Sequence, residues 1–109
     1  VQVKTSDEPS KYGLPPAQLP AFLDALREYG TLRVRGLMTL AIHSTEANEV
    51  RACFRLLRAL RDQAMAQGHA LPRLSMGMSD DFPLAIAEGA TEVRIGSAIF
   101  GARAPATDR

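Results

Sequence analysis

The chain has 109 residues, with 13 Lys and Arg against 12 Asp and Glu, and therefore a formal net charge of +1. This near-balance argues against a nucleic-acid-binding or membrane-surface protein, because both usually carry a clustered basic excess. The single cysteine, Cys53, excludes an internal disulfide and fits a reducing, cytoplasmic compartment. No run of residues is apolar for the length of a membrane span, so no membrane partner is expected.

The chain opens on a strand pattern, because residues 1–5 alternate apolar and polar side chains before a polar loop at 6–10. Its first residue is Val1 rather than Met, which leads us to expect a piece cut from a longer chain. A helix is predicted next, with Pro20 in its first turn and Gly30 at its end. The apolar face of this helix consists of Leu19, Phe22, Leu23, Leu26 and Tyr29.

A second strand is predicted at residues 32–39, followed by a long helix that Ser44 or Thr45 caps and Gly68 ends. The apolar face of this helix consists of Ala47, Val50, Phe54, Leu57, Leu60 and Ala64. Arginines at three- and four-residue spacing predict a solvated stripe, formed by Arg51, Arg55, Arg58 and Arg61. A third, short strand is expected at residues 71–75.

The last predicted helix begins at the N-cap Ser79, with Asp80 and Asp81 in its first turn, and runs through Glu88. Residues 92–95 predict a fourth strand. The order β-α-β-α-β-α-β indicates right-handed crossovers and parallel strands, and hence the α/β class. Periodicity alone leaves two architectures open, a small open sheet and half of an eight-stranded barrel.

Two segments at strand ends carry residues suited to ligand chemistry. Ser-Met-Gly-Met-Ser at 75–79 follows the third predicted strand, and Gly-Ser at 96–97 follows the fourth. Parallel α/β folds bind ligands at the carboxyl ends of their strands, and barrels often hold phosphate with their last two loops. Glycine amides and serine hydroxyls at these ends can face an anion. Ordinary strand-to-helix turns have the same composition, and that interpretation stays open.

Arg94, at the end of the fourth predicted strand, needs a polar or anionic partner, because an unpaired buried charge is costly. A salt bridge to Glu92 is one candidate, and a ligand atom is the candidate that we favour. His43 is expected in a loop and His69 in solvent. No spacing of His, Cys, Asp and Glu predicts a metal site or a Ser–His–Asp arrangement.

Four strings, in order and across nearly the whole chain, resemble the pyridoxal phosphate homeostasis proteins of the YggS/PROSC family. They are Ser-Lys-Tyr-Gly at 10–13, Arg-Gly-Leu-Met-Thr at 35–39, Leu-Ser-Met-Gly-Met-Ser-Asp-Asp at 74–81 and Val-Arg-Ile-Gly-Ser-Ala-Ile-Phe-Gly at 93–101. The last two strings are long and specific. The resemblance implies that residues 1–109 are the C-terminal half of a (β/α)8 TIM-type barrel, a partial alanine racemase-like domain.

By the same resemblance the cofactor is pyridoxal 5′-phosphate (PLP), and the protein is a non-catalytic carrier that takes part in cofactor homeostasis. Arg94 would face the pyridine nitrogen, while Gly96 and Ser97 would bind the phosphate, joined by Ser79 and Ser75. An arginine at the ring nitrogen keeps that nitrogen unprotonated, which weakens the cofactor as an electron sink. PLP-dependent apoenzymes would be the recipients of the cofactor, and the full-length protein would be a monomer.

The family's Schiff-base lysine lies at the end of its first barrel strand, in an N-terminal half that these residues do not include. We transfer that role to neither Lys4 nor Lys11; Lys11 is expected on the surface, with a second phosphate contact as the alternative. Ser97 stands where the family more commonly has Thr, which keeps the hydroxyl.

Two other functions stay open. One is a fold-type III PLP enzyme, similar to a racemase or decarboxylase, or another phosphate-binding barrel enzyme. The other is a fragment without activity, whose unpaired strand edges would favour self-association.

Overall fold

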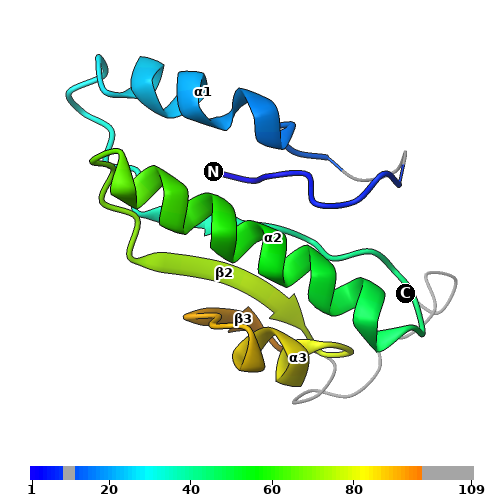
Figure 1. The fold of residues 1–109 in the computed structure, drawn as a ribbon. Helices are drawn as coiled ribbons and strands as arrows, with labels where there is room; N and C mark the ends of the chain where they lie inside the picture. The colour runs from blue at the N-terminus through cyan, green and yellow to red at the C-terminus, as the bar shows by residue number, and fades with distance from the viewer. Residues whose placement is uncertain (9–11, 97–109) are drawn as a thin grey trace, which may run out of the picture.

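The computed structural model describes residues 1–8 and 12–96 (Figure 1). In chain order the elements are the 3-10 helix η1 (Pro16–Gln18), α1 (Leu19–Leu26), β1 (Gly36–Met38), α2 (Ala47–Ala66), β2 (Arg73–Met78), α3 (Phe82–Ala87) and β3 (Glu92–Arg94). Helices and strands alternate from α1 onward, as the sequence predicts. Lys11 and Ser97 lie outside the described residues, as do Ser10 and residues 98–101 of the strings that carry the family resemblance.

The sheet has the order β1-β2-β3, and both pairs of neighbouring strands are parallel. The N-terminal segment continues this sheet beyond β1: the amide of Val3 donates to the carbonyl of Met38, and the amide of Met38 to the carbonyl of Val1, both at 2.8 Å. The predicted first strand is reduced to isolated bridges, in which Gln2 pairs with Met38 and Val3 with Leu14. Parallel segments thus follow one another across the sheet in chain order, which confirms the predicted α/β class.

One face of the sheet is covered by α2, which contacts both β1 and β2 (Figure 1). The apolar side chains of α2 recur at helical spacing and pack against the side chains that the strands turn toward them. The buried residues of this layer are Val50, Phe54, Leu57 and Ala64 from α2 and Leu37, Leu74 and Met76 from the strands. Leu19 and Leu23 of α1 belong to the same core. Removing this apolar surface from water is the main force that holds the sheet to its helices.

The opposite face of the sheet is polar and open within the described part of the chain. Side chains alternate along a strand, so Arg73 and Ser75 point away from the buried Leu74 and Met76. Arg73 pairs with Glu92 across this face at 3.1 Å, and their side chains are 62% and 45% exposed. Polar groups that the sheet can offer to a ligand therefore lie on this face.

Several predicted strand boundaries are wrong. β1 begins at Gly36 rather than at residue 32, and β3 ends at Arg94 rather than at residue 95. β2 runs from Arg73 to Met78 instead of over residues 71–75, because Pro72 cannot donate to a sheet ladder. The Ser-Met-Gly-Met string has the composition of a turn, yet it pairs with β3. Ser75 is therefore inside a strand.

The predicted N-caps of two helices are also wrong. The N-cap of α2 is Glu46, and the hydroxyl of Ser44 accepts the Glu46 amide at 3.0 Å just outside the helix. The N-cap of α3 is Asp81 rather than Ser79. The Asp81 carboxylate reaches back and accepts the amide of Met78 at 2.7 Å, which closes the turn that contains Ser79.

The two histidines differ in their surroundings. His43 is exposed in the loop after β1, as predicted. The prediction for His69 is wrong, because its side chain is only 7% exposed and its Nε2 lies 3.1 Å from Oδ1 of Asp24 on α1. His69 thus ties the start of the segment before β2 to α1, and solvent does not surround it.

Candidate functional site

Arg94 is the central residue of the candidate site, because its side chain joins the end of β3 to a residue inside β2 and to the residue after β1. It is the last residue of β3, and its Nη1 donates to Oγ of Ser75 on β2 at 2.9 Å. Its Nη2 contacts the carbonyl oxygen of Thr39, directly after β1, at 3.5 Å. The strands are parallel, so these three residues lie toward one edge of the sheet, where α/β folds bind their ligands.

The positive charge of Arg94 meets no carboxylate within the described residues. The alternative salt bridge to Glu92 is not formed, since Oε1 of Glu92 pairs with Nη1 of Arg73 at 3.1 Å. Both partners of Arg94 are neutral oxygens, and the three residues are half-buried or buried. A half-buried guanidinium with only neutral partners favours an anion or a strong acceptor as a further partner.

Thr39 is a supporting residue that the sequence-based reasoning did not identify. Its side chain is buried; its hydroxyl donates to the carbonyl of Val3 at 2.8 Å and lies 2.8 Å from the hydroxyl of Thr5. The Thr39 amide donates to the carbonyl of Ser75 at 3.1 Å. Thr39 therefore links the N-terminal segment and β2 at the carboxyl end of β1. A polar residue directly after a buried strand was the available signal.

The two glycines near the site have different roles. Gly77 has a φ of +104°, and a Cβ added there would lie 2.7 Å from Cβ of Ala85 on α3. Gly77 is therefore required for the packing of α3 against β2 rather than for a ligand. Gly96 is exposed, and a Cβ added there would meet no described atom within 4 Å. No described atom thus limits the approach of a ligand to the backbone of Gly96.

Only two of the five predicted site residues are in direct contact with each other in the described part of the structure. Ser75 and Arg94 are hydrogen-bonded to each other. Ser79 lies in the turn after β2, and Gly96 follows β3 by two residues, so both stand at the strand ends where they were expected. The fifth predicted residue, Ser97, lies outside the described residues.

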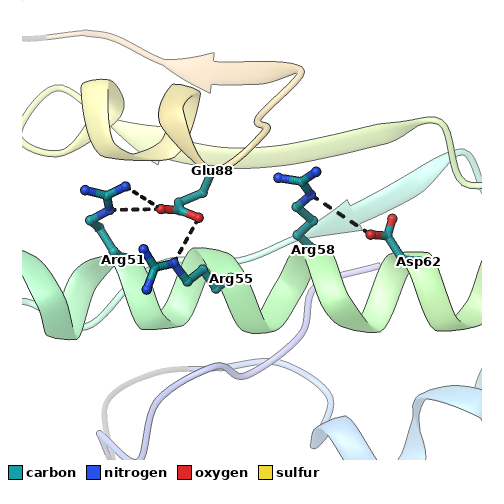
Figure 2. Close-up of polar contacts among 5 residues, drawn as sticks. All are labelled: Arg51, Arg55, Arg58, Asp62 and Glu88. Atoms are coloured by element: carbon teal, nitrogen blue, oxygen red, sulfur yellow. Dashed lines mark hydrogen bonds and ion pairs between the residues drawn. The ribbon is translucent and has the colours of Figure 1, made fainter.

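A buried carboxylate joins the end of α3 to α2 (Figure 2). Glu88, which follows α3, is 7% exposed and accepts hydrogen bonds from Nε of Arg51 at 2.9 Å and Nε of Arg55 at 3.1 Å. These two side-chain hydrogen bonds hold the pKa of Glu88 below its ordinary value. The predicted solvated arginine stripe on α2 is confirmed for Arg55 and Arg58, whose side chains are 64% and 52% exposed. It is wrong for Arg51 and Arg61, whose side chains are 34% and 16% exposed.

Two classes of site or segment are not found in the described residues. No group of three or more His, Cys, Asp or Glu side chains among residues 1–8 and 12–96 could hold a metal ion. None of the helices in that part of the chain is long and apolar enough to cross a membrane.

The family model for the alanine racemase N-terminal domain matches residues 1–104. The chain belongs to this family. It is also 47% identical over 103 residues to the pyridoxal phosphate homeostasis protein of Pseudomonas aeruginosa, and the match covers 94% of this chain and 44% of that protein. The protein of the same name from Aquifex aeolicus is 43% identical over 104 residues, with 94% and 46% covered.

Solved structures of this family superpose on the chain. PipY of Synechococcus elongatus, described as a COG0325 family member without PLP, is 42% identical with a TM-score of 0.85; the match covers 92% of this chain and 47% of PipY. PipY with PLP bound is 41% identical with a TM-score of 0.82, over 93% of this chain and 47% of that one. The chain thus spans under half the length of the relatives that it matches.

These matches confirm two of the sequence-based predictions. The resemblance to the pyridoxal phosphate homeostasis proteins is confirmed. The fold class, an α/β part of a barrel with parallel strands, is also confirmed. That the chain corresponds to the C-terminal half of the barrel stays a prediction.

Proposed function

We propose that this chain supplies the phosphate and pyridine-ring contacts of a protein that binds PLP and takes part in its intracellular homeostasis. The observation that carries this proposal is the guanidinium of Arg94, which Ser75 and Thr39 hold at the carboxyl ends of the strands without a carboxylate partner among the described residues. The names of the relatives and the PLP-bound structure of PipY support the choice of ligand.

The donor groups at this edge fit the chemistry of PLP. The cofactor presents an anionic phosphate and a pyridine nitrogen that accepts a hydrogen bond. Arg94 uses two of its N–H groups on Ser75 and Thr39, and a guanidinium has further N–H donors in the same plane. No described atom limits the approach of a ligand to the backbone of Gly96. Together these groups can serve one ligand with an acceptor at one end and an anion at the other.

We assign the ring contact to Arg94 and the phosphate contacts to Ser79, Gly96 and Ser97. Ser79 lies in the turn after β2 and Gly96 follows β3, and barrels commonly hold phosphate with the loops after their last strands, which supports this assignment. When bound, the cofactor supplies an aldehyde and an electron-withdrawing ring, and an arginine at the ring nitrogen keeps that nitrogen unprotonated and the ring a weak electron sink. The covalent anchor is assigned to a lysine of the longer protein, outside these residues.

The groups around Arg94 suit a non-catalytic PLP carrier better than a PLP-dependent enzyme. A racemase or decarboxylase needs a positioned acid or base near the ring. Within the described residues, the side chains and carbonyls that contact Arg94 are those of Ser75 and Thr39, and neither is such a group. PLP-dependent apoenzymes are the recipients in this proposal, and the buried, unpaired Cys53 fits a reducing, cytoplasmic compartment.

The test is the retention of PLP by variants of the protein that carries these residues. Arg94→Gln removes the guanidinium, and we expect the affinity for PLP to fall at least about tenfold, since hydrogen bonds to charged groups are strong. Ser97→Ala should lower retention as well. Arg73→Gln is the matched control, because Arg73 is an exposed arginine on the same sheet face, paired with Glu92. Occupancy is measured by absorbance after gel filtration.

Unchanged occupancy in both Arg94→Gln and Ser97→Ala would defeat the assignment of the site. The same preparations, assayed for racemase and decarboxylase turnover, should be no faster than free PLP. Turnover clearly above that background would favour the enzyme alternative over the carrier.

A further inference from the structure

We infer that Ser75 is a positioning residue for Arg94, and that it acts on the cofactor through the guanidinium rather than by contact with the phosphate. This role depends on the proposed function of Arg94 and reassigns one of the residues expected at the phosphate. It follows from three features: the hydrogen bonds of Arg94, the depth of Ser75 in the strand and the backbone link to Thr39.

The two hydrogen bonds of Arg94 differ in strength. The bond from Nη1 to Oγ of Ser75 is 2.9 Å long, which is the usual length of an N–H···O bond. The contact from Nη2 to the carbonyl of Thr39 is 3.5 Å long, at the outer limit of such a bond. The hydroxyl of Ser75 is therefore the main restraint on where the guanidinium points.

Ser75 also lies deeper in the sheet than Ser79. It is the third residue of β2 and pairs with Glu92 at the start of β3. Ser75 is followed by three more residues of β2, whose pairing with β3 is irregular between Ser75 and Met78, and Ser79 lies in the turn beyond them. Ser79 stands at the loop end, where the phosphate is expected, and Ser75 stands below it beside Arg94.

Ser75, Thr39 and Arg94 form a closed ring of hydrogen bonds across three strands. The carbonyl of Ser75 accepts the amide of Thr39 at 3.1 Å, the carbonyl of Thr39 accepts Arg94, and the hydroxyl of Ser75 accepts Arg94 as well. The backbone of Thr39 keeps its position without the Ser75 hydroxyl. Loss of that hydroxyl would therefore free the guanidinium while leaving the strands paired.

The experiment compares Ser75→Ala with Ser75→Thr, which keeps a hydroxyl, in the protein that carries these residues. Thr91→Ala is the matched control, since the Thr91 hydroxyl also joins β2 to the segment at β3: it accepts the amide of Leu74 at 2.8 Å and donates to its carbonyl at 3.2 Å. Three quantities are measured: the affinity for PLP, the competition by inorganic phosphate, and the pH dependence of the absorption spectrum of bound PLP.

We expect Ser75→Ala to weaken PLP binding about tenfold, because a bond to a charged donor is lost. The spectral titration of the bound ring should move to higher pH, since a misplaced guanidinium no longer opposes protonation of the ring nitrogen. Inorganic phosphate should compete as it does in the unmodified protein. Ser75→Thr should restore both properties, and Thr91→Ala should change neither. In an Arg94→Gln background, Ser75→Ala should have no further effect.

Two results would overturn the positioning role while leaving the proposed function intact. One is a Ser75→Ala protein with weakened competition by inorganic phosphate and an unchanged spectral titration, which would make Ser75 a phosphate ligand. The other is a Ser75→Ala protein that behaves as the unmodified protein does. Failure of the proposed function looks different: the unmodified protein binds no PLP, or Arg94→Gln and Ser97→Ala both bind it unchanged. Either result would contradict both the proposed function and the positioning role of Ser75.

Discussion

At the scale of single residues, the room for a side chain differs among three glycines, and this difference distinguishes glycines needed for folding from one proposed for ligand binding. A Cβ at Gly36 on β1 would overlap the backbone carbonyl of Arg73 on β2, and one at Gly77 would lie 2.7 Å from Ala85. A Cβ at Gly96 would meet no described atom within 4 Å. The first two glycines are thus required by the pairing and packing of the chain itself, whereas Gly96 leaves space that the proposed ligand would occupy.

Gly96→Ala should therefore weaken PLP binding without destabilising the fold. The added methyl group enters the space proposed for the ligand, and we expect the affinity to fall about tenfold while the stability stays within about 0.5 kcal/mol. Gly36→Ala is the contrasting variant, because overpacking of this kind costs about 1–3 kcal/mol. Thermal unfolding and PLP titration of both variants provide the check. Tight binding by Gly96→Ala would place the phosphate elsewhere.

Arg94 shows what residue patterns could and could not predict about the site. A lone arginine at the end of a buried strand predicted a need for a partner, and the family strings predicted its neighbourhood. Its actual partners, Ser75 and Thr39, are 19 and 55 residues away in the chain. Such contacts depend on strand order and register, which no local pattern contains.

At the scale of elements, Glu88 joins α3 to α2 (Figure 2). Its carboxylate is bound by Arg51 at 2.7 Å and by Arg55 at 3.1 Å, and its side chain is 9% exposed. Arg58 and Asp62, farther along α2, form a contrasting pair at 4.0 Å with both side chains more than half exposed. The buried cluster should matter for stability, and the exposed pair should contribute little.

We predict that Glu88→Gln lowers the melting temperature in a pH-dependent way. Arg51 and Arg55 lower the pKa of Glu88 in the folded protein, so the ionised carboxylate stabilises the fold above the pKa that it has when unfolded. That stabilisation is lost as the pH falls through the lowered pKa. The difference in melting temperature between the two proteins should be large at neutral pH and shrink toward acid pH, as followed by circular dichroism.

Asp62→Asn is the control for this prediction, because it removes a charge from the same helix at a side chain that is 56% exposed, with Arg61 at 2.9 Å and Arg58 at 4.0 Å. Its melting temperature should stay close to that of the unmodified protein at every pH. A difference for Glu88→Gln that is the same at neutral and acid pH would show that the carboxylate charge is not what fixes α3.

The order and type of the elements were predictable, but several of their ends were not. Apolar spacing in α2 identified the helix and its buried face, since Val50, Phe54 and Leu57 are all buried as expected. The extent of β2 was missed because Ser-Met-Gly-Met has the composition of a turn. That string is a strand only because β1 and β3 pair with it on both sides, which is a property of the assembled sheet.

At the scale of the whole molecule, the sheet has one face covered by α2 and a second face that none of the described helices is seen to cover in the same way, where Arg73 and Glu92 are exposed. The chain spans under half the length of the relatives that it matches. In the proposed function the second face turns toward the remainder of a barrel, and the strand ends hold the cofactor. The lysines of this chain are Lys4 and Lys11, and neither is assigned the covalent bond. These residues would then bind PLP noncovalently, by hydrogen bonds and charge.

The most direct test of this noncovalent binding is to titrate the chain with PLP, reduce any Schiff base with borohydride and locate the product by mass spectrometry. We predict saturable binding that dialysis reverses and that Arg94→Gln weakens, with no single lysine reduced in proportion to the bound cofactor. A stoichiometric, site-specific reduced adduct on Lys4 or Lys11 would contradict the prediction.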